Sequence, residues 1–456
     1  MDGERFVARS RLPAPAAEAF RWHERPGALE RLTPPWERVE VLERPRGIGD
    51  GARAVLRVSA GPLRLRWVAE HSAYEVGRRF VDTQVEGPFA RWVHEHRFEP
   101  AGEGESVLED RIEYALPLGP LGAAIGGPLT RRRLRRMFRW RHEVTGADLE
   151  RHAASVGPPL RVGVTGSSGL VGSALRPFLE TGGHRVVGLA RPGAGLAPAS
   201  LEGLDAVVHW AGESVGGGRW SPERKGRILG SRVDGTRALV RAMAGSAARP
   251  RVLVCASAVG YYGDRGEEDL DESSAPGEGF LSEVARRWEE AAAEAGSLGI
   301  RVVSLRLGVV LAAASGALPR MLPAFRFGAG GRIGNGRQFW SWVALDDVLG
   351  SVLFVLRRES ISGPVNVVAP RPVTSARFAG TLGRVLRRPA VAPLPAAAVR
   401  VAMGEMGESL LLASQRVRPA RLLDAGFPFR HPELEGALRF ELGIVREPPG
   451  GIEIEE

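Results

Sequence analysis

The sequence predicts an α/β fold, in which a doubly wound parallel sheet with a small additional subdomain follows a separate α+β domain. Two observations predict the parallel sheet. A short β-rich segment at residues 160–165 runs into a glycine-rich turn and an amphipathic helix, and further buried strands then alternate with helical segments. A third observation predicts the α+β domain: before residue 153, segments with the two-residue period of strands precede one long helical segment.

Length and composition agree with several globular domains. The chain has 456 residues, of which 44% are hydrophobic and 25% are charged, so a disordered or fibrous protein is excluded. At about 100–200 residues per domain, the length allows about two to three domains. We expect domains at residues 1–152, 160–365 and 366–445, with a proline-containing linker at 153–159 and a solvated tail at 446–456.

Charge and cysteine content exclude several function classes. The formal net charge is +9, but the arginines are scattered among acidic neighbours, so we expect no nucleic-acid binding. Cys255 is the single cysteine, which excludes an intrachain disulfide, and its apolar surroundings predict a packed thiol. No apolar run approaches the ~20 residues of a membrane helix, and the N-terminus lacks a signal-peptide pattern. We therefore expect a cytoplasmic protein without membrane contact.

Alternating apolar residues define strands in the N-terminal domain. The period of two runs through residues 63–69, 92–98 and 108–116, which predicts half-buried strands of an antiparallel sheet. Residues 129–152 instead carry apolar side chains at helical spacing, so a long helix is expected to end the domain. The apolar positions of that helix are Leu134, Met137, Phe138, Val144 and Leu149.

A curved sheet followed by one long helix resembles the START/polyketide-cyclase-like superfamily of helix-grip domains, and residues 80–98 look like the central strands of bacterial members. The resemblance implies an apolar pocket for a small hydrophobic ligand. His94 and His96 would point to the same side of their strand. Because zinc sites need three or four ligands, two histidines alone do not predict a metal site, and none is expected.

The segment after residue 160 carries the pattern of a dinucleotide-binding turn. Gly166 allows a tight turn after the strand, Gly169 lets the main chain approach a pyrophosphate, and Gly172 lets the helix pack against the sheet. Unpaired N–H groups at the helix N-terminus would face the phosphates. The pattern predicts a Rossmann-type sheet, and a turn without a ligand is the alternative. The remaining residues expected to line this turn are Ser167, Ser168, Leu170 and Val171.

The residue after the next strand favours one cofactor over another. The strand at residues 184–190 is followed by Arg191, where an acidic residue would hold the ribose 2′-hydroxyl of NAD. An arginine can pair with a 2′-phosphate instead, so we expect NADP as the cofactor. The alternative is that Arg191 is one more surface arginine in an arginine-rich chain.

Two further buried strands are expected at residues 204–212 and 251–257. Ligands of open α/β sheets bind at the carboxyl ends of the strands. His209, Gly212 and Ser257 are therefore expected where a cofactor and a substrate would lie.

Several motifs in order resemble the extended short-chain dehydrogenase/reductase superfamily, and within it an atypical group of bacterial epimerase-family proteins. The similarity runs from about residue 160 to about residue 440. It implies that Ala211 and Arg232 join the cofactor-binding residues and that the C-terminal segment is a substrate subdomain. The motifs are the glycine turn, His209-Trp-Ala-Gly212, Arg232-Val-Asp-Gly-Thr236 and Ala256-Ser-Ala-Val-Gly-Tyr-Tyr-Gly263.

The resemblance also implies a catalytic Tyr-x-x-x-Lys pair on a helix, which this chain lacks. Phe280 stands at the tyrosine position and Val284 at the lysine position, and neither side chain exchanges a proton. Lys225 is the single lysine and is not expected nearby. The candidates beside the expected nicotinamide site are Ser257, Tyr261 and Tyr262, with Asp264 or Glu283 as acid or base. Alternatively, the two tyrosines cover the sheet edge and the serine caps a strand.

Two functions remain open from the sequence. The preferred one is an NADP-dependent oxidoreductase or epimerase that acts on a small carbonyl or carbinol compound, fused to a domain for a hydrophobic ligand. Loss of the Tyr/Lys pair favours the alternative, a non-catalytic NADP(H)-binding sensor or scaffold. A basic stretch at residues 219–225 is expected either to hold an anionic substrate group or to be a solvated helix face. A homodimer is one assembly that the sequence allows.

Overall fold

The computed structural model describes residues 3–60, 63–193, 195–444 and 451–455. The chain divides into two units. Unit 1 comprises residues 1–156 together with 177–183 and 442–456, and unit 2 comprises residues 157–176 and 184–441. Within the described ranges, no helix combines the length and the apolar character needed to cross a bilayer. Part of the predicted tail, residues 446–450 and 456, lies outside the described residues.

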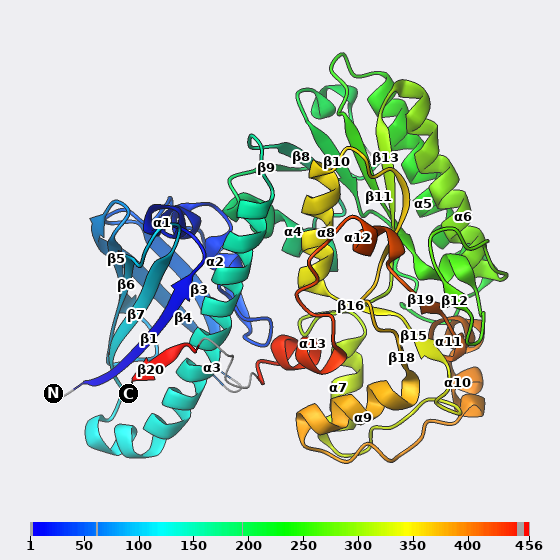
Figure 1. Cartoon of the computed structure of the whole chain (residues 1–456). Helices are drawn as coiled ribbons and strands as arrows, with labels where there is room; N and C mark the ends of the chain where they lie inside the picture. Colours follow the sequence, from blue (N-terminus) through cyan, green and yellow to red (C-terminus); the bar gives the residue numbers. More distant parts are fainter. Residues whose placement is uncertain (1–2, 61–62, 194, 445–450, 456) are drawn as a thin grey trace. The chain divides into compact units, whose positions relative to one another are not determined.

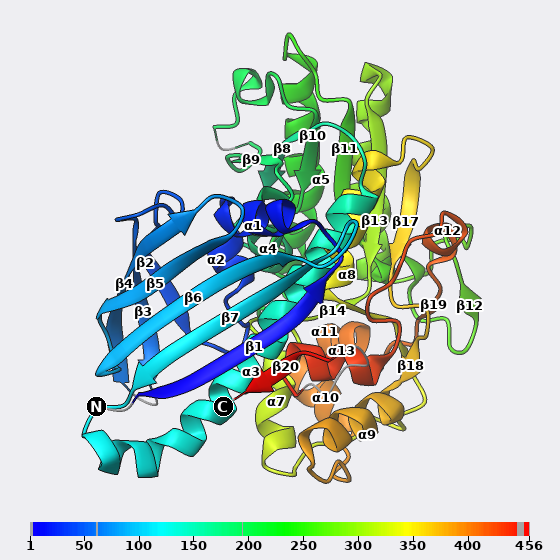
Figure 2. The same ribbon diagram turned by 60° about the vertical axis from the view of Figure 1, so that its left-hand side comes forward.

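Unit 1 is built on one eight-stranded antiparallel sheet, in the order β2-β3-β4-β5-β6-β7-β1-β20. Figure 2 shows it as a single curved sheet. The predicted strands at residues 63–69, 92–98 and 108–116 are confirmed within β4, β6 and β7. The strands are β1 (Glu4–Leu12), β2 (Val39–Glu43), β3 (Arg53–Ala60), β4 (Leu63–Glu75), β5 (Arg79–Glu86), β6 (Arg91–Pro100), β7 (Ser106–Ala115) and β20 (Glu453–Glu455).

The last of these strands corrects the prediction of a solvated tail. Ile454 of β20 pairs with Ala8 of β1, so the sheet ends with a segment from the other end of the chain. Ile452 and Ile454 pack against the core that contains Phe6 and Phe138, while Glu453 and Glu455 are exposed. The alternation of isoleucine and glutamate is that of an edge strand with one buried face.

The helices of unit 1 are α1 (Ala16–Glu24), α2 (Ala28–Arg31) and α3 (Gly119–Ala154). As predicted, Leu134, Phe138, Val144 and Leu149 are buried along one side of α3. Leu134 and Phe138 pack against β1, β6 and β7. The helix begins before the predicted residue 129 and continues through a glycine-rich segment, whose low helix propensity hid this first part from the sequence pattern.

Unit 2 contains a six-stranded sheet in the order β17-β13-β11-β10-β8-β9, and all of its strand pairs are parallel. The strand order reverses at β8, because β9 lies on one side of it and β10 on the other. This arrangement confirms the predicted doubly wound sheet of Rossmann type and places a switch point between β8 and β10. The strands are β8 (Arg161–Thr165), β9 (Arg185–Gly188), β10 (Ala206–His209), β11 (Val252–Ala258), β13 (Arg301–Leu307) and β17 (Gly363–Val367).

Helices cover both faces of this sheet. Figure 1 shows α5 (Pro222–Ala244) and α6 (Phe280–Ala293) along one face and α8 (Leu345–Arg357) on the other. Leu239 and Met243 of α5 and Trp288 of α6 enclose Leu253 and Cys255 of β11 in one core. Burial raises the pKa of the Cys255 thiol, which agrees with the predicted packed thiol. Helix α4 (Leu170–Thr181) follows β8 directly.

Short elements complete unit 2 after the main sheet. Three two-stranded sheets join β12 to β19, β14 to β16 and β15 to β18. Their bounds are β12 (Asp269–Leu270), β14 (Val309–Leu311), β15 (Phe339–Trp340), β16 (Trp342–Ala344), β18 (Val373–Thr374) and β19 (Arg416–Val417). The remaining α-helices are α7 (Leu318–Arg326), α9 (Ser375–Leu386), α10 (Ala396–Met403), α11 (Glu405–Gly407), α12 (Ala420–Asp424) and α13 (Leu434–Glu441).

Candidate dinucleotide and active site

The glycine turn lies at the carboxyl end of β8, at the switch point of the sheet. Gly166 has φ of 66°, a left-handed conformation, and a Cβ there would lie 2.8 Å from the main-chain nitrogen of Ala211. Gly172 is packed even more closely, because a Cβ would lie 2.3 Å from the Gly166 carbonyl oxygen. Both positions therefore require glycine, one for the turn and one for the approach of α4.

The middle of the turn is open to solvent, in contrast to its two ends. Ser168 and Gly169 are exposed, and a Cβ on Gly169 would meet only the Gly166 carbonyl oxygen within 4 Å. The N–H of Gly169 donates to that same carbonyl, which closes the turn at 3.0 Å. Ser167 and Leu170 are half-buried, and Val171 is buried. The space above Gly169 and the N-terminus of α4 thus fit a dinucleotide pyrophosphate.

Arg191 follows β9 at the same edge of the sheet. Gly188, the last residue of β9, passes close enough to Ser167 that a Cβ on it would lie 3.6 Å from the serine Oγ. Arg191 is exposed, and its guanidinium contacts no partner among the described residues. Its cation is therefore without a protein partner at the edge of the sheet that carries the glycine turn. Leu189 and Ala190 precede it, so no acidic residue occupies the end of this strand.

His209 ends β10 but turns into the protein interior. Its exposed fraction is 0%, its Nδ1 lies 2.6 Å from Thr165 Oγ1, and its Nε2 lies 3.1 Å from Thr236 Oγ1. Trp288 Nε1 donates to the same Thr236 oxygen at 2.9 Å. Burial, with a smaller contribution from Arg232, lowers the pKa of His209 to about 4. The neutral imidazole links β8, β10 and α5 through these two contacts, so the side chain is fully engaged inside the protein.

Ala211 and Gly212 leave the sheet beside Arg232 of α5. A Cβ on Gly212 would lie 3.1 Å from the Arg232 Cζ, so the guanidinium rests on the glycine. Arg232 donates to the carbonyls of Glu213 at 2.9 Å and Ile228 at 3.2 Å. Burial lowers the pKa of Arg232 to about 10. The geometry brings these three predicted cofactor residues together at the switch point.

Ser257 lies near the end of β11 and belongs to a buried polar network. Its hydroxyl donates to Glu289 Oε1 at 2.6 Å. Arg306 of β13 forms a two-pronged ion pair with the same carboxylate, Nε to Oε1 and Nη2 to Oε2, both at 2.8 Å. Burial alone would lower the pKa of Arg306, but the Glu289 carboxylate raises it above its usual value. The Glu289 carboxylate and the Arg306 guanidinium therefore hold each other in place next to Ser257.

The two candidate tyrosines, which lie in the 3-10 turn η2 (Val259–Tyr262), differ in their surroundings. Tyr262 is fully buried; its hydroxyl donates to Asn366 Oδ1 at 2.7 Å and accepts from Arg306 Nη1 at 2.9 Å. Burial raises the pKa of Tyr262 to about 12. Tyr261 is half-buried and stacks on the Arg306 guanidinium, 3.5 Å from Cζ to the ring centroid. Among the described residues, its hydroxyl has no hydrogen-bond partner.

The helix that resembles the catalytic helix of the superfamily carries no proton-transfer pair. Val284 lies on the buried side of α6. Phe280, in the first turn of the same helix, packs edge-on against Trp220. The structure corrects one expectation, because Lys225 does lie nearby. Its Nζ is 5.0 Å from the Phe280 ring centroid and 2.6 Å from Glu405 Oε1. The single lysine of the chain therefore stands over the ring that replaces the tyrosine.

An open pocket of about 680 Å³ surrounds this lysine. Its wall combines the start of α6 with α5 and α11, and it includes Lys225, Phe280, Ser282, Glu283, Arg286 and Glu405. The two arginines of the basic stretch, in contrast, turn to main-chain carbonyls: Arg219 donates to Val401 and Arg224 to Ser214. Of the basic stretch, only Lys225 therefore lines this pocket. Asp264 is exposed and accepts from the N–H of Ser414 at 3.0 Å.

Sequence reasoning missed three residues of the network: Glu289, Arg306 and Asn366. They come from α6, β13 and β17; Arg306 and Asn366 begin segments that resemble motifs of the epimerase family, but the sequence assigns no role to any of the three side chains. One signal was available for Glu289. It lies on the helix that begins at Phe280, which the sequence already singles out, but its contact with Ser257 is visible only in the folded chain.

Comparison with known families agrees with the division into units. The profile of the NAD dependent epimerase/dehydratase family matches residues 162–368. The profile of the family "Polyketide cyclase / dehydrase and lipid transport" matches residues 12–139, and a domain of unknown function, DUF1731, matches residues 394–441. Fold and site together define an NAD(P)-dependent Rossmann protein of the short-chain dehydrogenase class, joined to a polyketide-cyclase-like domain.

Similar proteins identify the family. The epimerase family protein ML0860 of Mycobacterium leprae (strain TN) is 40% identical over 296 residues, covering 61% of this chain and 94% of that protein. A crystal structure of a nucleoside-diphosphate sugar epimerase from Corynebacterium glutamicum is 33% identical, with a TM-score of 0.79, over 96% of this chain and 90% of that one. Human epimerase family protein SDR39U1 (isoform 2), solved with NADPH, is 35% identical, with a TM-score of 0.57, over 61% of this chain and 98% of that one. The chain belongs to the epimerase family.

Proposed function

We propose that unit 2 is an NADP(H)-dependent oxidoreductase or epimerase that acts on a small carbonyl or carbinol compound. One observation supports this most strongly. The Tyr261 hydroxyl is unengaged among the described residues, while the ring beneath it rests on the fixed Arg306–Glu289 ion pair. A positioned hydroxyl with no protein partner is the group that a substrate oxygen can meet.

Two features support NADP(H) over NAD(H). Arg191 leaves its guanidinium free beside the glycine turn, where a 2′-phosphate would accept two hydrogen bonds from it. The human relative, 35% identical, was solved with NADPH. The turn at Gly166–Gly172 and the N-terminus of α4 would hold the pyrophosphate, and the bound nicotinamide would supply or accept a hydride.

The protein's own residues would hold and exchange the proton. Tyr261 would donate a hydrogen bond to the substrate oxygen and deliver or remove its proton. Ser257 and Tyr262 would act as positioning residues, because both hydroxyls already donate to protein acceptors, Glu289 and Asn366. The mixed charges of the pocket beside Lys225 suit a polar substrate. In this mechanism the usual Tyr/Lys pair is replaced by one unengaged hydroxyl, on the half-buried Tyr261, whose ring stacks on the guanidinium of the Arg306–Glu289 ion pair.

A specific observation favours the second candidate, a non-catalytic NADP(H) sensor or scaffold. The two positions that carry proton transfer in the superfamily are occupied by the apolar Phe280 and Val284, and Val284 is buried. A protein with this function would bind NADP(H) but would not catalyse hydride or proton transfer. Tyr261 would then only cover the edge of the sheet.

Substitution of Tyr261 separates the two functions. Wild type, Tyr261→Phe and the control Tyr74→Phe, which makes the same change in unit 1, are compared for NADPH oxidation over carbonyl compounds and sugar nucleotides. We expect turnover by wild type and control, and a loss of about 100-fold or more in Tyr261→Phe, the usual size of a lost acid–base group. The NADPH dissociation constant should stay within about twofold, because Tyr261 lies outside the glycine turn.

Two results would contradict the proposal in different ways. If wild type binds NADPH but converts no compound, the sensor function replaces the enzyme. If Tyr261→Phe turns over as fast as wild type, the protein is an enzyme whose proton-transfer group lies elsewhere.

A further inference from the structure

A cluster of histidine and aspartate side chains lies inside unit 1, on the face of the sheet that packs against α3. His94 and His96 share the inner face of β6 with the buried Trp92 and Phe98, because side chains of a strand alternate between its faces. The strand register then adds two acids. Asp82 of β5 lies opposite His94, and Asp110 of β7 lies opposite His96.

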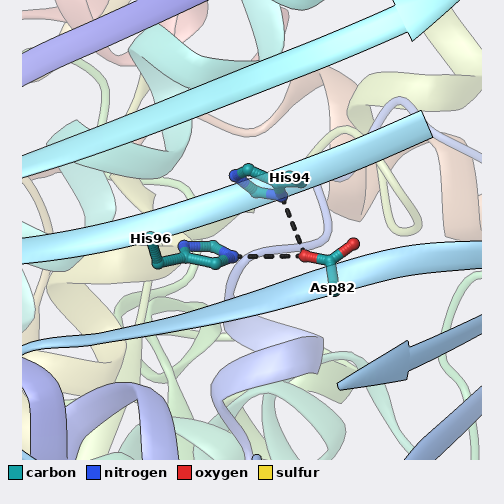
Figure 3. A group of neighbouring side chains, drawn as sticks. All are labelled: Asp82, His94 and His96. Atoms are coloured by element: carbon teal, nitrogen blue, oxygen red, sulfur yellow. Dashed lines mark hydrogen bonds and ion pairs between the residues drawn. The ribbon is translucent and has the colours of Figure 1, made fainter. Parts of the chain in front are cut away.

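Both imidazoles turn toward one oxygen of Asp82, as Figure 3 shows. His94 Nδ1 lies 3.0 Å and His96 Nε2 lies 3.3 Å from Asp82 Oδ2. One donor atom from each of these three residues lies within 4.8 Å of the other two. In a tetrahedral zinc site with bonds near 2.0–2.1 Å, neighbouring donor atoms are about 3.3 Å apart. The separations from Asp82 already match that spacing.

The opposite side of both rings is held by a second carboxylate. Asp110 Oδ1 lies 2.9 Å from His94 Nε2 and 2.6 Å from His96 Nδ1. Asp110 Oδ2 in turn lies 2.6 Å from His142 Nε2, and His142 Nδ1 lies 2.7 Å from Ser10 Oγ. His94 is thus oriented as metal-binding histidines usually are, by a carboxylate that accepts the N–H of the nitrogen that faces away from the ion, whereas the His96 Nδ1 contact with Asp110 is close but is not a hydrogen bond.

The cluster also encloses negative charge. Exposed side-chain fractions are 4% for His94, 8% for His96 and 4% for Asp110, against 18% for Asp82. Asp82 and Asp110 are therefore two largely buried carboxylates, and the Arg141 guanidinium of α3 is one cation close to both. Two buried carboxylates require positive charge close by. A divalent cation would balance them while the histidines stay neutral.

We propose that Asp82, His94 and His96 form a binding site for a divalent transition-metal ion of the Zn²⁺ class. This inference concerns unit 1 and stands independently of the proposed function of unit 2. Two imidazole nitrogens favour Zn²⁺ and similar ions over Mg²⁺ or Ca²⁺, which prefer oxygen. Three protein ligands leave a fourth position for water or for a ligand oxygen, as in catalytic zinc sites. The partial exposure of Asp82 gives that position access to solvent.

The sequence alone does not predict this site, because the two acids lie on neighbouring strands. Asp82 is twelve residues before His94 in the chain, and only the hairpin register places the two side by side. Asp110 and His142 come from two further elements, β7 and α3. A histidine pair on one strand becomes a candidate metal site only when the sheet is assembled.

The test loads the untagged full-length protein, stripped with a chelator, with Zn²⁺ or Co²⁺. We expect one equivalent of Zn²⁺ per chain after desalting, and visible ligand-field absorption from Co²⁺ that Zn²⁺ abolishes. Asp82→Asn and His96→Gln should weaken Zn²⁺ binding more than 10-fold, and Asp110→Asn by about 10–100-fold, as for other outer carboxylates. The control His71→Gln should bind like wild type, because the Nδ1 of that buried histidine of β4 lies 3.0 Å from the Ala52 carbonyl, its ring packs against Phe80, and it supplies no donor atom to the three-residue group.

X-ray absorption of the Zn²⁺-loaded wild type tests the same ligands without any substitution, should a variant fail to fold. Two imidazole nitrogens with additional oxygen ligands are expected around the zinc. The proposal is overturned if the wild type retains no stoichiometric metal, if Asp82→Asn and His96→Gln bind as tightly as His71→Gln, or if the zinc lacks the two imidazoles. The cluster would then be a proton-balanced ion-pair network, in which the carboxylates raise the pKa of His94 to about 9 against the effect of burial.

Discussion

His209 couples the stability of unit 2 to pH through a single buried ring. Its pKa falls from the ordinary 6.5 to about 4, because burial disfavours the charged imidazole. The folded protein therefore binds this proton less tightly than the unfolded chain does. The contribution of the neutral ring is complete above pH 6.5 and is lost as the pH falls through about 4.

We predict that acid destabilises the wild type more than it destabilises His209→Asn. Between pH 6.5 and about pH 4, the wild type should lose roughly 3 kcal/mol relative to the variant, from about 1.4 kcal/mol per pKa unit. Calorimetric melting of both proteins across this range measures the difference, and other titrating groups cancel in it. If the difference in unfolding free energy between the two proteins stays constant from pH 6.5 to about 4, His209 is protonated in the folded state or does not control the pH dependence of stability.

Single residues also show what the sequence could and could not reveal about the site. Gly166 and Gly172 could be assigned because each position imposes a local backbone or packing demand, and Gly169 because the glycine spacing predicts an open main chain between them. The roles of Ser257 and Tyr262 could not be separated from that of Tyr261. Their hydrogen bonds go to Glu289 and Asn366, which lie on other elements.

At the scale of elements, the junction of β8 and α4 depends on one close approach. In an open helix, replacing glycine by alanine is favourable by up to about 1 kcal/mol. At Gly172 the added Cβ would lie 2.3 Å from the Gly166 carbonyl oxygen and 2.9 Å from the Ser167 Cα. The turn would have to move away from the helix, and the N–H groups that face the pyrophosphate would move with it.

We predict that Gly172→Ala weakens NADPH binding by at least about 10-fold, the cost of one or more lost hydrogen bonds to a charged group. Gly235→Ala is the matched control, since it lies in helix α5 with nothing within 4 Å of its added Cβ. Equilibrium titration by nicotinamide fluorescence measures both variants. Equal affinities in the two variants would mean that the turn does not hold the cofactor.

Elements with strong periodicity were the ones that sequence could predict. The strands β4, β6 and β7 and the buried face of α3 follow from alternating or helical apolar positions. Strand β20 could not be predicted in this way, because three residues give too short a pattern and its partner β1 lies at the other end of the chain. The start of α3 was missed for a different reason, since glycines weaken its helical signal.

At the scale of the whole molecule, each of the two units contains its own network of buried polar side chains. Unit 2 combines a solvent-facing glycine turn with a fixed Glu289–Arg306 pair, and unit 1 encloses a His/Asp cluster in a helix-grip interior. The order of motifs along the chain was sufficient to predict both fold classes. The two polar networks were not predictable, because each joins side chains from three or more elements that only the folded chain brings together.

The central claim is that unit 2 holds NADP(H) at the glycine turn, with Arg191 on the 2′-phosphate. The most direct measurement titrates the full chain with NADPH and NADH, as wild type, Arg191→Ala and the control Arg185→Ala, an exposed arginine at the start of β9. We predict that NADPH binds more tightly than NADH, and that Arg191→Ala weakens NADPH about 10–100-fold while leaving NADH unchanged. Equal affinity for the two cofactors, an Arg191→Ala variant that behaves like Arg185→Ala, or no binding of either cofactor would contradict the account.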